Sequence, residues 1–238
     1  MNAVLDHGEG VCEHGAASHD GTEPSAASAP ETSRAWLLIE HPGPWPHEPT
    51  ETQLPAPLGE LASAADQLGI RVQMIRRPGR RMGPARSVYA GWTAGAEPWL
   101  RRGSRPGDLD LEKLAAGSAP GFGVEVSEPV FLVCTHAQRN ACCARFGGPL
   151  ATQLAARYPG QVFQTTHVGG HRFAANLVIL PHGLYYGPVG LDSAVAAIGA
   201  YEHGMVTAGR YRGRAGQPKE AQEAEHALLE RAGSLALS

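Results

Sequence analysis

The chain has 238 residues, a formal net charge of -3, 42% hydrophobic residues and 18% charged residues. This composition is typical of a globular protein, and the length allows one large domain or two small ones. The small negative charge argues against binding to nucleic acid or to a membrane surface. No apolar run approaches the roughly 18 residues of a membrane span, and the N-terminus lacks the pattern of a secretory signal. We therefore expect a cytoplasmic protein.

Residues 1–31 contain six acidic side chains and no Lys or Arg, set among Gly, Ala and Ser. Such a segment has too little apolar surface to offset the entropy that it would lose on ordering. We predict a disordered acidic tail. It also contains Cys12, His7, His14 and His19, which we interpret as incidental to the tail rather than as a metal site.

Residues 32–128 are predicted to form an N-terminal α/β half. AWLLIE at 35–40 is typical of a buried strand, and apolar spacing predicts a helix at 58–68. RVQMIRR and RSVYAGW read as strands, 98–107 as a Pro/Gly-rich loop and 109–116 as a short helix. Neither a dinucleotide fingerprint nor a phosphate-binding P-loop is present. Seven arginines form two clusters, which indicate either solvated loops or a docking face for an acidic partner: Arg76, Arg77, Arg80, Arg81, Arg101, Arg102 and Arg105.

Residues 129–210 follow the order of a thioredoxin-like domain. VFLVC is a continuous apolar strand of the kind buried in a parallel sheet. A helix is predicted from Cys143 or shortly after, with Pro149 in its first turn. Strands at 162–166 and 176–180, the strand LYYGPV and a helix at 191–203 complete the domain. Residues 211–238 are predicted to carry a C-terminal helix, and no internal repeat is strong enough to claim.

Two cysteines and two histidines fall where strands of this domain end. Cys134 closes one strand and Cys143 follows in CTHAQRNACCARFGG, while His167 and His171 flank a Gly-Gly pair after the next strand. Ligands gather at the carboxyl edge of open α/β sheets, and the glycines allow the loop to aim both imidazoles at one point. Thiolate and imidazole together select zinc, copper or iron-sulfur centres. The pattern therefore predicts a metal or iron-sulfur site.

The spacing does not match two familiar motifs. Eight residues separate Cys134 from Cys143, whereas a zinc finger places its first two cysteines two to four residues apart. A Rieske centre has Cys-x-His in one loop and Cys-x-x-His in the other. Cys134-Thr135-His136 matches the first pattern, but Cys143 is followed by Ala144, Arg145 and Phe146. Cys142 is interpreted as a spare or packing residue, although the choice between it and Cys143 stays open. His136 is expected to lie outside the ligand set.

The segments CTHAQRNACCARFG and HVGGHRFAANLVILPHGLYYGPV resemble the sucrase/ferredoxin-like family, and AWLLIEHPGPWP resembles its N-terminal portion. The resemblance covers about residues 32–210. It implies a thioredoxin-like ferredoxin in which two histidines replace the second cysteine pair. The implied ligands of this non-Rieske [2Fe–2S] cluster are Cys134, Cys143, His167 and His171.

The resemblance leads us to expect an electron carrier without substrate turnover. Two thiolates and two neutral imidazoles balance the +2 charge of an oxidised core, so the reduction potential should exceed that of a four-cysteine ferredoxin. The second nitrogen of each ring could couple a proton to the electron. The expected partner is a redox protein of unknown identity. The alternatives are a thioredoxin-type thiol oxidoreductase, using Cys142 or Cys143, and a structural Cys2His2 zinc site.

Overall fold

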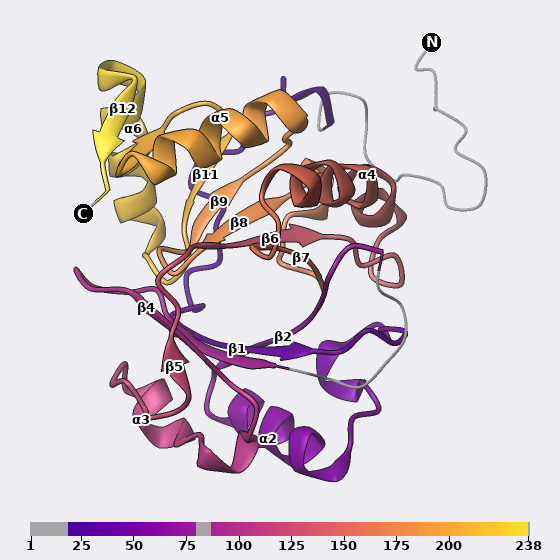
Figure 1. Ribbon diagram of the computed structural model, residues 1–238. Coiled ribbons are helices and arrows are strands. Elements are labelled where there is room, and N and C mark those ends of the chain that lie inside the picture. Colours follow the sequence, from indigo (N-terminus) through magenta and orange to yellow (C-terminus); the bar gives the residue numbers. More distant parts are fainter. Residues whose placement is uncertain (1–18, 80–86, 238) are drawn as a thin grey trace.

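The computed structural model describes residues 19–79 and 87–237. Within these residues ten strands form one mixed sheet, in the order β11-β9-β8-β6-β7-β2-β1-β3-β4-β5. The sheet is strongly curled, and helices lie on the outside of both of its halves (Figure 1). The predicted α/β class is confirmed.

The N-terminal half of the sheet begins with a strand, a helix and a parallel strand. Strands β1 and β2 are parallel neighbours in the sheet and are joined in sequence by helix α2. Strands β3, β4 and β5 extend the other side of β1 as antiparallel strands. The bounds are β1 (Ala35–Glu40), η1 (Pro49–Glu51), α2 (Ala56–Gln67), β2 (Arg71–Arg76), β3 (Val88–Trp92), β4 (Trp99–Gly103), η2 (Pro106–Asp108), α3 (Leu111–Ala115) and β5 (Val124–Glu125). Strand β4 replaces part of the loop that we predicted, because it pairs with β3 along its whole length.

The C-terminal half repeats this order of elements. Strands β6 and β7 are parallel and joined by helix α4, and β8, β9 and β11 extend the other side of β6 as antiparallel strands. The bounds are β6 (Val130–Cys134), α4 (Ala141–Arg157), β7 (Val162–Thr165), η3 (His171–Phe173), β8 (Leu177–Leu180), β9 (Leu184–Tyr186), α5 (Leu191–Glu202), β10 (Met205–Thr207), β11 (Tyr211–Arg214), α6 (Lys219–Ala232) and β12 (Ser234–Ala236). Up to α5 this is the order expected of a thioredoxin-like domain, and α6 is the expected C-terminal helix. Strands β10, β11 and β12 were not predicted: residues 211–238 were expected to carry a helix, but β11 also pairs with β9 and β12 with β10.

The two halves are joined edge to edge by their second strands. Strand β2 pairs antiparallel with β7, with Ile75 opposite Thr165 and Arg76 opposite Gln164. The same topology thus occurs twice in one continuous sheet, although the sequence shows no repeat. A repeat of topology needs only the same order and burial of elements, and many sequences satisfy that.

Three hydrophobic clusters explain the layers. One lies between α4, α5 and the C-terminal half-sheet, and another between α2, α3 and the N-terminal half-sheet. The third lies between the half-sheets and contains residues of both, including Trp36, Tyr89, Leu132 and Tyr185. Strand β6 is therefore covered on both faces and is buried throughout. This two-sided burial accounts for its uninterrupted apolar sequence.

Helix α4 begins earlier than the sequence suggested. The side chain of Asn140 caps it by accepting a hydrogen bond from the backbone N–H of Cys142, at 2.9 Å. Asparagine is among the residues that favour this position. The early start places Pro149 inside the helix rather than in its first turn, so that expectation was wrong.

The predicted tail, residues 1–31, is described only from His19 onward. The backbone N–H of Ser28 donates to the carbonyl of Arg212 at 2.8 Å, and Ala29 is buried. Residues 1–18 lie outside the described part of the chain. Ordered contacts with the body therefore begin before residue 32.

Candidate metal centre

Cys134 is held at the carboxyl end of β6, in the middle of the sheet. Its backbone N–H donates to the carbonyl of Asn176 at 3.1 Å, and its side chain is 0% exposed. It belongs to the cluster between the two half-sheets. The thiol therefore has a fixed backbone and an apolar surrounding.

Cys143 reaches the same point from the first turn of α4. This requires close packing of the helix on the strand end, and Gly147 provides it: a Cβ at this position would lie 2.0 Å from the carbonyl oxygen of Cys134. Real Cβ atoms never approach so closely, so only glycine fits here. The Asn140 cap and Gly147 together place the Cys143 thiol, which is also 0% exposed.

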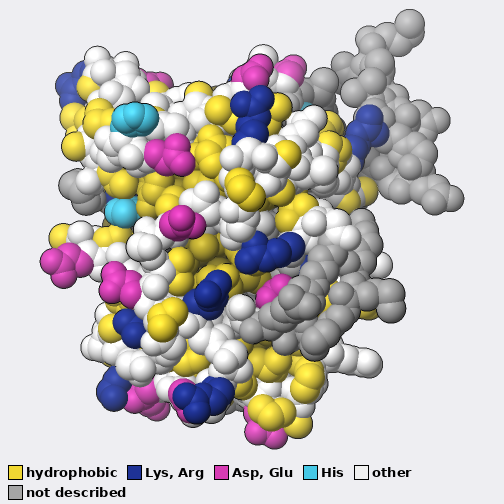
Figure 2. Space-filling model, viewed as in Figure 1, with side chains coloured by type: hydrophobic (Ala, Val, Ile, Leu, Met, Phe, Trp, Pro, Cys, Tyr) yellow, Lys and Arg dark blue, Asp and Glu magenta, His cyan; other side chains and the backbone are white. Residues whose placement is uncertain are grey.

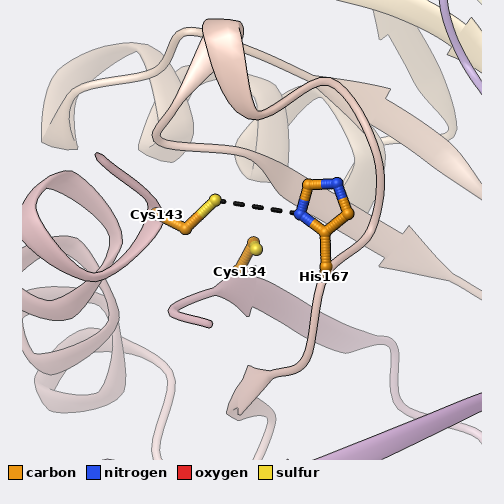
Figure 3. Close-up of side chains that lie close together, drawn as sticks. All are labelled: Cys134, Cys143 and His167. Atoms are coloured by element: carbon orange, nitrogen blue, oxygen red, sulfur yellow. Dashed lines mark hydrogen bonds between the residues drawn. The ribbon is translucent and has the colours of Figure 1, made fainter. Parts of the chain in front are cut away.

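His167 comes from the neighbouring parallel strand. Cys134 pairs with Thr165 in register, so His167 stands two residues beyond the partner of Cys134 at the same edge. Its Nδ1 lies 3.9 Å from the Sγ of Cys143. Figure 3 shows the two thiols and the imidazole turned toward one another.

The ligand atoms of Cys134, Cys143 and His167 all lie within 4.8 Å of one another. Typical zinc-to-ligand bond lengths in a tetrahedral site place the ligand atoms about 4 Å apart. Two sulfurs and a nitrogen in this arrangement thus suit a soft or borderline metal. No second group of three His, Cys, Asp or Glu side chains with metal-binding spacing occurs among the described residues.

The two thiols are coupled through one proton. A hydrogen bond from Cys143, with a smaller contribution from His167, holds the pKa of Cys134 well below its ordinary value despite burial. The pKa of Cys143 is raised, first because its thiol donates that bond and then by burial. A metal that binds both sulfurs as thiolates must displace the proton of this hydrogen bond.

His171 lies beside this group rather than within it. It begins η3, and its ring centroid is 5.5 Å from that of His167, with an angle of 43° between the ring planes. Between them Gly169 and Gly170 have φ angles of 96° and 67°, the left-handed region that favours glycine. Three of the four predicted ligands are thus brought together, with the fourth next to one of them.

The other two candidates of the cysteine segment lie outside the group. Cys142 is buried and contributes no atom to it, and it is disulfide-bonded rather than the spare or packing residue that we expected. His136 directs Nε2 at the carbonyl of Pro46, at 2.7 Å, and its Nδ1 accepts the backbone N–H of His167 at 3.2 Å. The imidazole of His136 therefore bonds to the backbone of the predicted ligand His167.

A buried arginine that the sequence analysis did not single out shapes the glycine loop. Arg212 is 1% exposed and donates to the carbonyl of Gly169 at 3.3 Å and to Oδ1 of Asn176. Asn176 in turn donates to the carbonyl of Gly170 at 2.9 Å. A Cβ on Gly170 would lie 2.2 Å from Nη2 of Arg212, so this glycine is also required by the close approach.

Arg212 also adds positive charge behind the site. Burial lowers its pKa to about 10, so it stays protonated at neutral pH. Asn176 could have been suspected from the RFAAN segment, but Arg212 lies far along the chain on β11 and has no local signal.

None of the helices in the described part of the chain has the length and apolar character of a membrane span.

Comparison with known proteins supports the family assignment. The sucrase/ferredoxin-like family model matches residues 27–213, which is well over half of the chain. No curated protein and no solved structure matches. The match includes all four predicted ligands and begins close to Ser28, where contacts with the body are seen. The chain belongs to the sucrase/ferredoxin-like family.

Proposed function

We propose that this protein is an electron carrier that holds a [2Fe–2S] cluster on Cys134, Cys143, His167 and His171. The observation that carries the proposal is the buried gathering of two thiols and an imidazole in a chain of this family. Such a cluster, when bound, supplies one-electron transfer. The name of the family includes ferredoxin, which is consistent with this chemistry.

One side of the site is buried and the other side is accessible to solvent. Both thiols are fully buried, whereas His167 and His171 are half-buried and Arg172 is exposed. Electron exchange with another protein needs close approach, and the histidine side offers it. We propose that the redox partner docks there.

The histidines also supply a place for a proton. His167 turns Nδ1 toward Cys143, which leaves Nε2 to hold or release a proton. A potential coupled to one proton should fall by about 59 mV per pH unit. A potential independent of pH between 6 and 9 would contradict this part of the proposal.

The surface of this protein does not carry charge of one sign that would indicate the charge of the docking partner. On the face shown in Figure 2, basic and acidic side chains are interspersed. Near the site, Arg172 is paired with Glu23 at 3.1 Å, and Arg139 with Glu48. We therefore expect partner binding to depend only weakly on salt.

The decisive experiment is anaerobic purification followed by visible and EPR spectroscopy and by assays of iron and acid-labile sulfide. We expect a coloured protein with about two irons and two sulfides per folded chain. A colourless protein with one zinc per chain would overturn the proposal. The same experiment decides the second candidate, a structural zinc site, which the Cys-Cys-His group also suits.

The burial of the thiols argues against the thiol oxidoreductase alternative. A redox-active cysteine must be reached by its substrate, and catalytic thiols are at least partly accessible. Cys134 and Cys143 are both 0% exposed, and Cys142 is 1% exposed and disulfide-bonded rather than a free thiol. Reduction of insulin disulfides by protein free of iron would nevertheless restore this alternative.

A further inference from the structure

The N-terminal half reaches the candidate metal centre through the backbone of His167. The carbonyl oxygen of His167 accepts hydrogen bonds from Nη2 of Arg71 and from Nε2 of Gln73, both at 3.2 Å. Both donors are on β2, which belongs to the other half of the sheet. The peptide that follows His167 is thus held by two side chains from outside its own domain.

The backbone N–H of His167 is held as well. It donates to Nδ1 of His136 at 3.2 Å, while Nε2 of His136 faces the carbonyl oxygen of Pro46 at 2.7 Å. A carbonyl can only accept, so Nε2 carries the proton and Nδ1 has the free lone pair. This assigns one tautomer to His136, and Pro46 again belongs to the N-terminal half.

The donors themselves have little freedom to turn away. Oε1 of Gln73 accepts from the hydroxyls of Thr165 and Thr166, at 3.1 and 2.8 Å, and the side chain is 2% exposed. Arg71 donates to the hydroxyl of Ser33 at 2.9 Å and lies over the ring of Trp36, 5.2 Å from its centroid. Their orientation toward His167 is therefore built into the packing of both half-sheets.

We propose that His136, Arg71 and Gln73 are positioning residues that clamp the backbone of His167 and so keep its ring on the two thiols. We call these three residues the backbone clamp. With both its N–H and its carbonyl held, His167 cannot rotate its peptide planes without breaking partly buried hydrogen bonds. The clamp gives the N-terminal half a role at a centre to which it contributes no ligand, and it rests on the proposed function of that centre.

The first test examines the clamp in metal-free protein, by hydrogen exchange of the His167 amide followed by NMR. His136→Ala removes the acceptor, and His136→Asn restores it because Oδ1 of asparagine takes the place of Nδ1. A hydrogen bond of ordinary net strength predicts exchange about two- to tenfold faster in His136→Ala. We expect His136→Asn to exchange close to the wild-type rate. Equal rates in all three proteins would overturn the clamp.

The second test asks whether the clamp affects the ligand. In iron-loaded protein, His136→Ala and Arg71→Met should shift the EPR g-values and the reduction potential, and His136→Asn should shift them less. Tyr211→Phe is the matched control, since it removes a partly buried hydrogen bond to Glu225 of helix α6 rather than one to the backbone of His167. It should lower thermal stability without changing the spectrum.

The outcomes separate the clamp from the proposed function. Faster exchange with unchanged g-values and potential would overturn the positioning role and leave a bond that is only structural. If wild-type protein binds zinc instead of iron, the proposed function fails. The clamp is then judged by the amide exchange and by the visible spectrum of cobalt-substituted protein.

Discussion

The two halves of the sheet use the same scaffold for different purposes. In each, a buried strand is followed by a helix and a parallel strand, and antiparallel strands extend the other side. Strand β6 ends in Cys134, whereas β1 ends in Glu40. In the parallel neighbour strand, Cys134 pairs with Thr165 and Glu40 pairs with Ile75. Two residues after these partners, the C-terminal half has His167 and the N-terminal half has Arg77.

The corresponding edge of the N-terminal half is used for contact with the other half. Arg76 stacks on Trp45, 3.9 Å from the ring centroid, and donates to Gln164 at 2.9 Å. Arg77 lies 4.6 Å from the ring centroid of Phe163 and donates to the carbonyl of Gly160. These arginines were predicted as solvated loops or a docking face, and part of their surface is committed inside the molecule. The scaffold thus provides the strand edge, and the side chains decide whether it gathers thiols and an imidazole or contacts the neighbouring half-sheet.

The largest expected effect comes from removing the thiols, which distinguish the edge at β6 from the corresponding edge at β1. Cys134→Ser or Cys143→Ser should abolish iron binding, because a serine hydroxyl is a hard ligand that stays protonated where a thiolate is required. Iron per folded chain measures the effect. Cys142→Ser, one residue away and outside the group, removes a disulfide-bonded cysteine and should retain the iron; loss of iron in this variant, with iron retained in Cys143→Ser, would transfer the ligand role to Cys142.

Replacing a histidine makes the centre resemble a four-cysteine ferredoxin. His167→Cys should keep the colour and lower the reduction potential by on the order of 100 mV or more, because a third anionic ligand opposes addition of an electron. His171→Cys should act in the same direction. Redox titration followed by EPR provides the measurement, and an unchanged potential in either variant would exclude that histidine as a ligand.

The close packing of α4 on β6 can be tested at adjacent glycines. Gly147→Ala forces a Cβ toward the carbonyl of Cys134, and we expect it to lower the free energy of unfolding by about 1–3 kcal/mol and to reduce iron binding. Gly148→Ala has no atom within 4 Å of its new Cβ and should be neutral or stabilising by about 0.5–1 kcal/mol. Helix α2 offers a contrast, since a Cβ on Gly59 would lie 3.8 Å from its nearest neighbour. Urea denaturation compares the three variants, and equal effects at Gly147 and Gly148 would argue against the close approach.

The smallest expected effect concerns acid stability of the C-terminal half. Burial lowers the pKa of His182 from 6.5 to about 4, and its Nδ1 is 2.7 Å from the hydroxyl of Tyr201. The unfolded chain binds a proton at higher pH than the folded chain, so this residue's contribution to stability is present above pH 6.5 and is lost as the pH falls toward 4. Because the side chain is partly accessible, we expect only about 1 kcal/mol. His182→Gln should flatten the decline of stability between pH 6.5 and 4, and an unaltered slope would contradict the assignment.

Several parts of the fold could be predicted because their signals are local. The buried run of β6, the apolar face of α2 and the glycine pair between His167 and His171 each carry their information within a few residues. Strand β4 was missed because its pairing with β3 outweighs the Pro and Gly residues around it. The start of α4 was misplaced because the capping role of Asn140 was overlooked.

The sequence by itself determined the strand–helix–strand order that begins at β1 and at β6 and the kinds of ligand atoms near the strand ends, since both follow from residue type and spacing. Only the tertiary structure decided how those atoms are held. The bonds from Arg71 and Gln73 to His167, and from Arg212 to Gly169, join residues far apart in the chain. The physical reason is that strand pairing and close packing are long-range, so the partner of a buried polar group cannot be found from its neighbours in sequence.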